Sequence, residues 1–200
     1  MPNKNSDLHG SAPDKSEMAL LLIDLINDFE FPEGDQLLQF ALPMAERLAK
    51  LADRARAAGV PVVYANDNFG RWRSDFGAQV EHCLSDGVRG EPIVRKLRPK
   101  PEDYFVVKPK HSAFFETPLD TLLKYLGVKT VVVAGVATNI CVLFTANDAY
   151  MHDLGLIVPS DGTAANTEED HRYALEQMRT VLKAEVVPVD KIKLKKGAAN

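Results

Sequence analysis

Hydrophobic positions in this chain group into short, unbroken runs, and longer stretches with helical spacing lie between them. Short runs of Leu, Ile and Val bounded by polar or turn residues are typical of strands that are buried on both faces, as in a parallel sheet. The clearest run begins at Thr130 and ends at Gly135. Similar runs predict further strands at residues 18–23, 60–65, 104–107, 155–158 and 185–187.

Amphipathic stretches alternate with these runs. Apolar residues at helical spacing predict a helix over residues 41–58 that ends before Gly59. Thr117 followed by Pro118 is a typical helix start and predicts a helix that ends at Leu126. Further helices are predicted over residues 140–151 and 168–183. Proline and glycine interrupt residues 79–103, which we expect to be irregular. The alternation predicts an α/β protein with three layers, α/β/α, around a Rossmann-like sheet of about six mainly parallel strands.

The 200 residues suit one domain of this kind. We expect residues 1–17, which are polar and contain Pro, Gly and Ser, to form a flexible leader. The single domain would then span residues 18–190, and residues 191–200 would form a basic C-terminal tail.

Charge and cysteine content narrow the function classes. The 24 basic and 28 acidic residues give a net charge of −4, so we expect no nucleic-acid partner. The apolar run that starts at Met18 is too short to cross a bilayer, so we expect no membrane partner. The chain has two cysteines, Cys83 and Cys141, and no signal-peptide pattern, which predicts reduced thiols and a cytoplasmic protein.

The stretch after Gly135 carries the first candidate chemistry. Thr138 and Asn139 are good N-cap residues, so the buried strand would turn directly into a helix with Cys141 in its first turn. Unpaired N–H groups and the helix dipole make a thiol at this place easier to ionise, and they could hold an oxyanion. The alternative is that Cys141 is a small buried hydrophobic residue, as most free cysteines are.

Two other polar residues end buried strands. Asp24 follows the strand at residues 18–23, and Lys108 follows the strand at residues 104–107. Taken separately, Asp24 could cap a turn and Lys108 could extend into solvent. Because the carboxyl ends of parallel strands meet at one edge of the sheet, Asp24, Lys108 and Cys141 together predict a base, a cation and a nucleophile in one site.

Five sequence motifs accompany these three residues. They are LLIDLINDF at residues 21–29, VKPKHSAF at 107–114, GVATNICV at 135–142, TANDA at 145–149 and SDG at 160–162. With these motifs the chain resembles the isochorismatase-like cysteine hydrolase family. The resemblance extends over nearly all of the chain from Met18 to Val187, and its motifs are specific for the family but not for a substrate.

The resemblance implies a catalytic triad of Asp24, Lys108 and Cys141. It also implies a cis peptide bond between Val136 and Ala137 and an oxyanion hole formed by the backbone N–H groups of Ala137 and Cys141. If the strand order is the usual 3-2-1-4-5-6, Lys108 begins two strands away from Asp24, and its loop would have to fold inward.

The chain departs from the nicotinamidase branch of the family, whose metal-binding Asp-x-His element and following His it lacks. Asp67 is present, but Asn68 and Phe69 stand where the histidine would be, and no histidine follows before His82. The resemblance therefore implies no metal and no cofactor, and it argues against nicotinamidase activity. His82 beside Cys83 makes a poor metal site without other donors nearby, so both are expected to be structural.

The pocket walls are predicted from the loops that follow the strands. His111 follows Lys108 closely and is expected to line the pocket, whereas His152 and His171 are expected on the surface or in packing contacts. The candidate substrate-binding residues are Phe29, Asn68, Trp72, Phe114 and Thr138.

Because Cys141 is present, we favour a hydrolase that cleaves the C–N bond of a small amide, ureido or carbamoyl compound through a thioester. Two alternatives stay open at this point. One is a vinyl-ether hydrolase of the isochorismatase type, which needs no cysteine nucleophile. The other is a non-catalytic binding or thiol-redox protein on the same fold. The family also implies a homo-oligomer, either a dimer or a tetramer.

Overall fold

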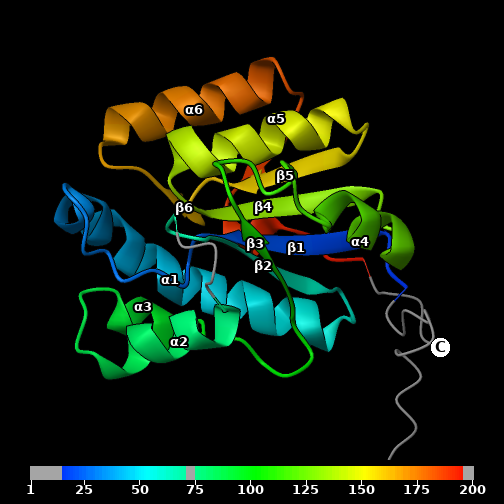
Figure 1. The fold of residues 1–200 in the computed structure, drawn as a ribbon. Helices are drawn as coiled ribbons and strands as arrows, with labels where there is room; N and C mark the ends of the chain where they lie inside the picture. Colours follow the sequence, from blue (N-terminus) through cyan, green and yellow to red (C-terminus); the bar gives the residue numbers. More distant parts are fainter. Residues whose placement is uncertain (1–14, 71–74, 196–200) are drawn as a thin grey trace, which may run out of the picture.

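A computed structural model describes residues 15–70 and 75–195 of the chain. Within those residues the strands form one sheet of seven, and every pair is parallel (Figure 1). The order is β3-β2-β1-β4-β5-β7, and the two-residue strand β6 pairs with β4 beyond the end of β5. This confirms the predicted parallel α/β fold, with one short strand more than expected. The strands are β1 (Met18–Ile23), β2 (Val62–Asp67), β3 (Tyr104–Lys108), β4 (Thr130–Val136), β5 (Gly155–Pro159), β6 (Thr163–Ala164) and β7 (Glu185–Val187).

Helices cover both faces of the sheet (Figure 1). One face packs against α1 (Gly34–Ala57), α2 (Phe76–Ser85) and α3 (Glu91–Lys96). The other packs against α4 (Leu119–Leu126), α5 (Leu143–Met151) and α6 (Glu168–Thr180). A π-helical turn, η2 (Thr138–Val142), leads into α5, and a short 3-10 helix, η3 (Val189–Lys191), follows β7.

The central strand β1 shows why the chain forms three layers. Leu20 and Leu22 point into the core shared with α1, whereas Leu21 and Ile23 point into the core shared with α4, α5 and α6. Side chains alternate between the two faces of a strand, so a strand that is apolar at every position needs cover on both sides. All six residues of β1 are buried.

Helix α1 begins seven residues before the predicted start at Ala41, and the reason lies in its buried face. Leu37, Ala41, Met44 and Leu48 are all buried, so the apolar stripe extends back through the first turns. Pro43 lies inside the helix with its ring exposed, and burial of this stripe outweighs the hydrogen bond that proline cannot donate.

Residues 79–103 were predicted to be irregular, and this prediction was wrong. They contain most of α2 and all of α3, both of which are short. The Asp75 side chain caps α2 by accepting a hydrogen bond from the Ala78 N–H at 3.2 Å, and Pro92 lies in the first turn of α3, where a missing N–H costs nothing. Helix α6 also ends at Thr180, three residues earlier than predicted.

Candidate active site

The turn that carries Cys141 begins at the carboxyl end of β4. Gly135 has φ of +123° and packs so closely against the Ile23 carbonyl oxygen of β1 that a side chain would collide with it. The peptide bond between Val136 and Ala137 is cis, as the family resemblance implies. The chain then enters η2, which places Cys141 two residues before the start of α5.

The N-cap prediction for this turn was wrong. The N-cap residue of η2 is Ala137, which has extended backbone angles and no capping side chain. Thr138 lies inside the helix, and its hydroxyl is bonded to His171 Nδ1 at 2.9 Å instead of to the helix backbone. Asn139 also lies inside η2.

Asp24 occupies the equivalent end of β1. Its backbone continues the pairing with β2, because the Asp24 N–H donates to the Ala65 carbonyl at 3.0 Å. Its carboxylate accepts a hydrogen bond from the Asp67 N–H at 2.7 Å, and its other oxygen lies 2.9 Å from Lys108 Nζ. The Asp24 side chain is 8% exposed, so the carboxylate is held on two sides and almost closed to solvent.

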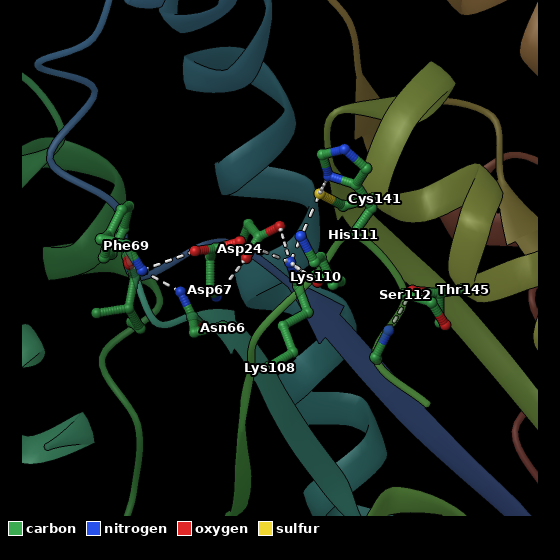
Figure 2. A network of polar contacts seen from close by, with 12 residues as sticks. Asp24, Asn66, Asp67, Phe69, Lys108, Lys110, His111, Ser112, Cys141 and Thr145 are labelled. Carbon is green, nitrogen blue, oxygen red and sulfur yellow. Dashed lines mark hydrogen bonds and ion pairs between the residues drawn. The ribbon is translucent and has the colours of Figure 1, made fainter. Parts of the chain in front are cut away.

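Lys108 reaches this carboxylate from two strands away. It is paired in register with Asp67 at the end of β2, and β2 lies between β3 and β1. The flexible four-carbon stem of lysine crosses over the end of β2, so the backbone loop does not have to fold inward as expected. The ammonium donates to the Lys110 carbonyl at 3.2 Å and lies 3.5 Å from an Asp67 carboxylate oxygen (Figure 2).

Cys141 completes the cluster. Its Sγ lies 3.5 Å from Lys108 Nζ, and the thiol also hydrogen bonds to the Asp24 carboxylate. In Figure 2, dashed lines join Lys108 Nζ both to the Asp24 carboxylate and to the sulfur. The structure therefore brings together the three residues that the sequence places at the ends of three different strands.

Burial sets the protonation preferences of these groups. It raises the pKa of Asp24, and the attraction of Lys108 offsets part of that shift. Burial alone would lower the pKa of Lys108, but the charges of Asp24, Cys141 and Asp67 raise it overall. Lys108 is thus held as a cation that faces two carboxylates.

The thiol of Cys141 behaves differently from the sequence-based expectation. Burial, followed by the negative charge of Asp24, raises its pKa, and Lys108 compensates only in part. The expectation of an easily ionised thiol took the helix start into account but not the low-dielectric surroundings or the neighbouring carboxylate. Cys141 therefore carries its proton at neutral pH, and a base must take the proton as the sulfur reacts.

His111 faces the same sulfur atom. Its Nδ1 lies 3.7 Å from Cys141 Sγ, and its ring packs at a tilt against Phe144 of α5, with the ring centroids 5.4 Å apart. The side chain of His111 is exposed. The expectation that this histidine lines the pocket agrees with its position.

These groups open into a cavity of about 340 Å³ at the carboxyl edge of the sheet. That volume suits a small metabolite. Its polar wall combines Asp24, Asp67 and His111 with Asn27 and Asn166, and its apolar wall combines aromatic and aliphatic side chains. The lining residues are Asp24, Asn27, Phe31, Leu37, Asp67, Phe69, His111, Val136, Ala137, Ile140, Cys141 and Asn166.

The substrate-binding residues proposed from sequence are placed elsewhere. Phe29 is fully buried in the core below the cavity, and its neighbour Phe31 lines the cavity instead. Asn68 points its carbonyl oxygen at the Gly70 N–H, 2.8 Å away. Phe114 stacks on His152, and Thr138 is fully buried against His171. None of these four residues is among those that line the cavity, and Trp72 lies outside the described residues.

The sequence reasoning missed Asp67, Phe69 and Ile140 as lining residues. Ile140 directly precedes the candidate nucleophile, and Asp67 and Phe69 follow a buried strand, which is the signal that identified Asp24. The selection favoured bulky or polar neighbours in each loop, whereas the direction of a loop side chain depends on the local turn. Phe69 has φ of +51°, which turns the chain at this point.

Metal ligands are not grouped near the cavity. Across residues 15–70 and 75–195, no three His, Cys, Asp or Glu side chains are arranged to hold an ion. Asp67 forms an ion pair with Lys108 and accepts a hydrogen bond from the Phe69 N–H. His82 contacts Asp28 and Asp86 on the surface. None of the helices in the described part of the chain is long and apolar enough to cross a membrane.

Comparisons with known proteins identify the family of the chain. The profile of the isochorismatase domain matches residues 18–190. The uncharacterized isochorismatase family protein YaaI of Bacillus subtilis is 42% identical, over 89% of this chain and 97% of that protein. The ureidoacrylate amidohydrolase RutB of Methylobacterium radiotolerans is 30% identical, over 84% of this chain and 76% of the relative.

A solved structure shows the same likeness. The N-carbamoylsarcosine amidase of Thermoplasma acidophilum superposes with a TM-score of 0.68. It is 28% identical, and the match covers 89% of this chain and 99% of that one.

Proposed function

The chain belongs to the isochorismatase family, and from that premise we propose that it is a cysteine hydrolase that cleaves the C–N bond of a small amide, ureido or carbamoyl compound. The observation that carries the proposal is the meeting of Asp24, Lys108 and Cys141, of which Asp24 and Cys141 line a cavity of about 340 Å³ and Lys108 is buried behind them. Relatives named as an amidohydrolase and an amidase support the reaction class.

The first chemical step makes use of the protonated thiol. Asp24 accepts the Cys141 proton while the sulfur attacks the substrate carbonyl carbon, so a free thiolate does not have to accumulate. The raised pKa of Asp24 suits this role, because a carboxylate that binds a proton readily is a better base near neutral pH. Lys108 remains charged and stabilises the negative charge as it moves from carboxylate to sulfur.

The oxyanion that forms would be held by the backbone N–H groups of Ala137 and Cys141. Removal of one donor from such a site typically costs about 10²–10³ in rate. Asp24 then returns its proton to the leaving nitrogen, and the amine departs. The acyl group stays on Cys141 as a thioester, which water hydrolyses to the acid and free enzyme.

The substrate would occupy the space between the polar and apolar walls of the cavity. Asn27, Asp67 and Asn166 offer polar groups to an amide, ureido or carbamoyl substrate, and Phe31 and Phe69 offer aromatic faces to its apolar part. These five replace the substrate contacts expected from sequence.

The test is ammonia release from a panel of small amides, ureido acids and carbamoyl compounds. Wild type, Cys141→Ala and Cys83→Ala are compared under one set of conditions. We expect release by wild type and by Cys83→Ala, because Cys83 is buried in α2 away from the cavity, and no release by Cys141→Ala. A folded wild type that releases ammonia from none of the compounds would contradict the proposal.

Alkylation by iodoacetamide separates this proposal from a non-catalytic role. Cys141 should react far faster than Cys83, because Cys141 lines the cavity whereas Cys83 is buried in the core. Exposure alone favours Cys141, so the decisive comparison is Asp24→Asn, which removes the proposed base. We expect the variant to slow alkylation of Cys141 near neutral pH, and an unchanged rate would show that Asp24 does not activate the thiol.

A further inference from the structure

His111 is an ionisable group in contact with the sulfur that the proposed acylation step does not use. Its Nδ1 lies 3.7 Å from Cys141 Sγ, and its ring lines the cavity. Figure 2 shows the imidazole and the Lys108 ammonium on opposite sides of the sulfur. Asp24 and Lys108 are buried, whereas His111 is exposed, so solvent entering the cavity meets the imidazole first.

The loop that carries His111 is fixed at both ends. On one side the Lys110 carbonyl accepts a hydrogen bond from Lys108 Nζ at 3.2 Å. On the other, the Ser112 hydroxyl donates to the Asp148 carboxylate at 2.5 Å, and the Ala113 N–H donates to Thr145 Oγ1 at 3.0 Å. Both partners belong to α5, the helix that follows Cys141. The imidazole is therefore held in a set position relative to the nucleophile.

We propose that His111 is the general base for the second half of the reaction, in which water hydrolyses the thioester on Cys141. The inference rests on the cysteine hydrolase function proposed above. It divides the proton transfers between two groups. Asp24, on the buried side, serves acylation, and His111, on the solvent side, serves deacylation.

The step balances as follows. His111 takes a proton from a water molecule as the water oxygen bonds to the thioester carbonyl carbon. The tetrahedral intermediate then collapses, the C–S bond breaks, and the carboxylic acid product leaves. The proton on His111 passes to the sulfur, which restores the Cys141 thiol and the neutral imidazole.

Two properties favour His111 over Asp24 for this step. An imidazole nitrogen can accept a proton from water and return it to the sulfur within one cycle. A base must also lie within hydrogen-bond reach of the water, about 2.6–3.2 Å. The thioester carbonyl carbon is bonded to Sγ, which lies only 3.7 Å from His111 Nδ1. A water that attacks this carbon from beside the N···S line is therefore within hydrogen-bond reach of the imidazole.

The test separates the two half-reactions with p-nitrophenyl acetate. Its leaving group departs without an acid, so the burst of p-nitrophenolate reports acylation and the steady rate reports deacylation. We compare wild type with His111→Ala and His111→Asn. The matched control is His152→Ala, which removes a histidine that stacks on Phe114 and does not line this cavity.

We expect both His111 variants to keep the burst rate within about twofold and to lose roughly 10²-fold in the steady rate, the low end for a general base. Acetylated Cys141 should then accumulate and be visible by mass spectrometry. The control should match wild type in both phases.

Other outcomes overturn the inference in distinguishable ways. Unchanged kinetics in both variants would remove His111 from the reaction and leave the proposed function standing. Equal slowing of burst and steady rate would show that His111 orients the thiol and does not activate water. A burst that persists in Cys141→Ala would instead refute the cysteine hydrolase itself.

Discussion

Replacement of Lys108 by methionine should destabilise the fold, in addition to any loss of activity. Lys108 is completely buried, and its ammonium is 2.9 Å from the Asp24 carboxylate, whose side chain is 8% exposed. Methionine has a similar length and no charge, so it fills the space but leaves Asp24 without its counter-ion. A buried charge that has lost its partner is among the most destabilising defects in a protein.

The expected magnitude follows from this burial. Breaking a buried ion pair by removal of one partner costs about 3–5 kcal/mol in the free energy of unfolding. In a protein of 150–250 residues each kcal/mol lowers Tm by about 2–4 °C, so the variant should melt roughly 6–20 °C below wild type. The loss of stability is largest at pH values at which Asp24 is ionised.

The loss should therefore depend on pH. In wild type the pKa of Asp24 is already raised by burial, and Lys108 holds the shift down. Without Lys108 the pKa of Asp24 in the folded state rises further, while its pKa in the unfolded chain stays at the ordinary aspartate value of 3.8. A group whose pKa is higher in the folded state than in the unfolded chain stabilises the fold at pH values below the unfolded-state pKa. This contribution is lost as the pH rises through the folded-state pKa. The deficit of Lys108→Met should be smaller at pH 5 than at pH 8.

Urea unfolding followed by circular dichroism at pH 5 and pH 8 measures this difference. The matched control is Lys124→Met, because Lys124 also pairs with an aspartate, Asp120, at 2.7 Å, but its side chain is 73% exposed. The control should lose at most about 1 kcal/mol at either pH. The double variant Asp24→Asn/Lys108→Met should regain part of the lost stability. The reasoning is refuted if Lys108→Met behaves like the control or if its deficit grows at pH 5.

Two further predictions concern the turn that carries Cys141. Gly135→Ala should destabilise the fold by about 2–5 kcal/mol and abolish Cys141 alkylation, because the added Cβ would collide with the Ile23 carbonyl oxygen. The control Gly127→Ala, also at positive φ but in open space, should cost about 1 kcal/mol. Urea unfolding and iodoacetamide labelling measure both effects, and equal losses of stability in the two variants would contradict a steric cause. Burial lowers the pKa of His171 below the ordinary histidine value of 6.5, so wild type should lose stability as pH falls from 7.5 to 5.5, and His171→Asn should lose less over the same range. Parallel slopes of unfolding free energy against pH would show that this histidine does not contribute.

The sequence was sufficient to predict the fold where a local hydrophobic pattern was compatible with only one structure. The apolar runs at β1 and β4 could be covered only by helices on both sides, and this predicted the three layers and the parallel sheet. The short helices α2 and α3 were not predicted, because a hydrophobic pattern with helical spacing is hard to recognise over ten or six residues. The Pro and Gly residues in this segment also suggested irregular structure.

Part of the candidate site could be predicted from sequence and part could not. Asp24, Lys108 and Cys141 could be selected from sequence because each ends or follows a buried strand, where polar residues need a reason to be present. The lining of the cavity could not be selected. Phe29 and Phe31 are two residues apart in one loop, yet one packs into the core and the other faces the cavity.

The sequence alone thus determined which residue types stand at the carboxyl edge of the sheet, since strand ends are fixed by local hydrophobic patterning. Tertiary structure alone decided that Lys108 crosses β2 to reach Asp24, that the thiol of Cys141 keeps its proton, and that His111 faces the sulfur. The physical reason is that distances between loops, burial and the local electric field depend on all the chain segments that meet at a point, and no single segment encodes them.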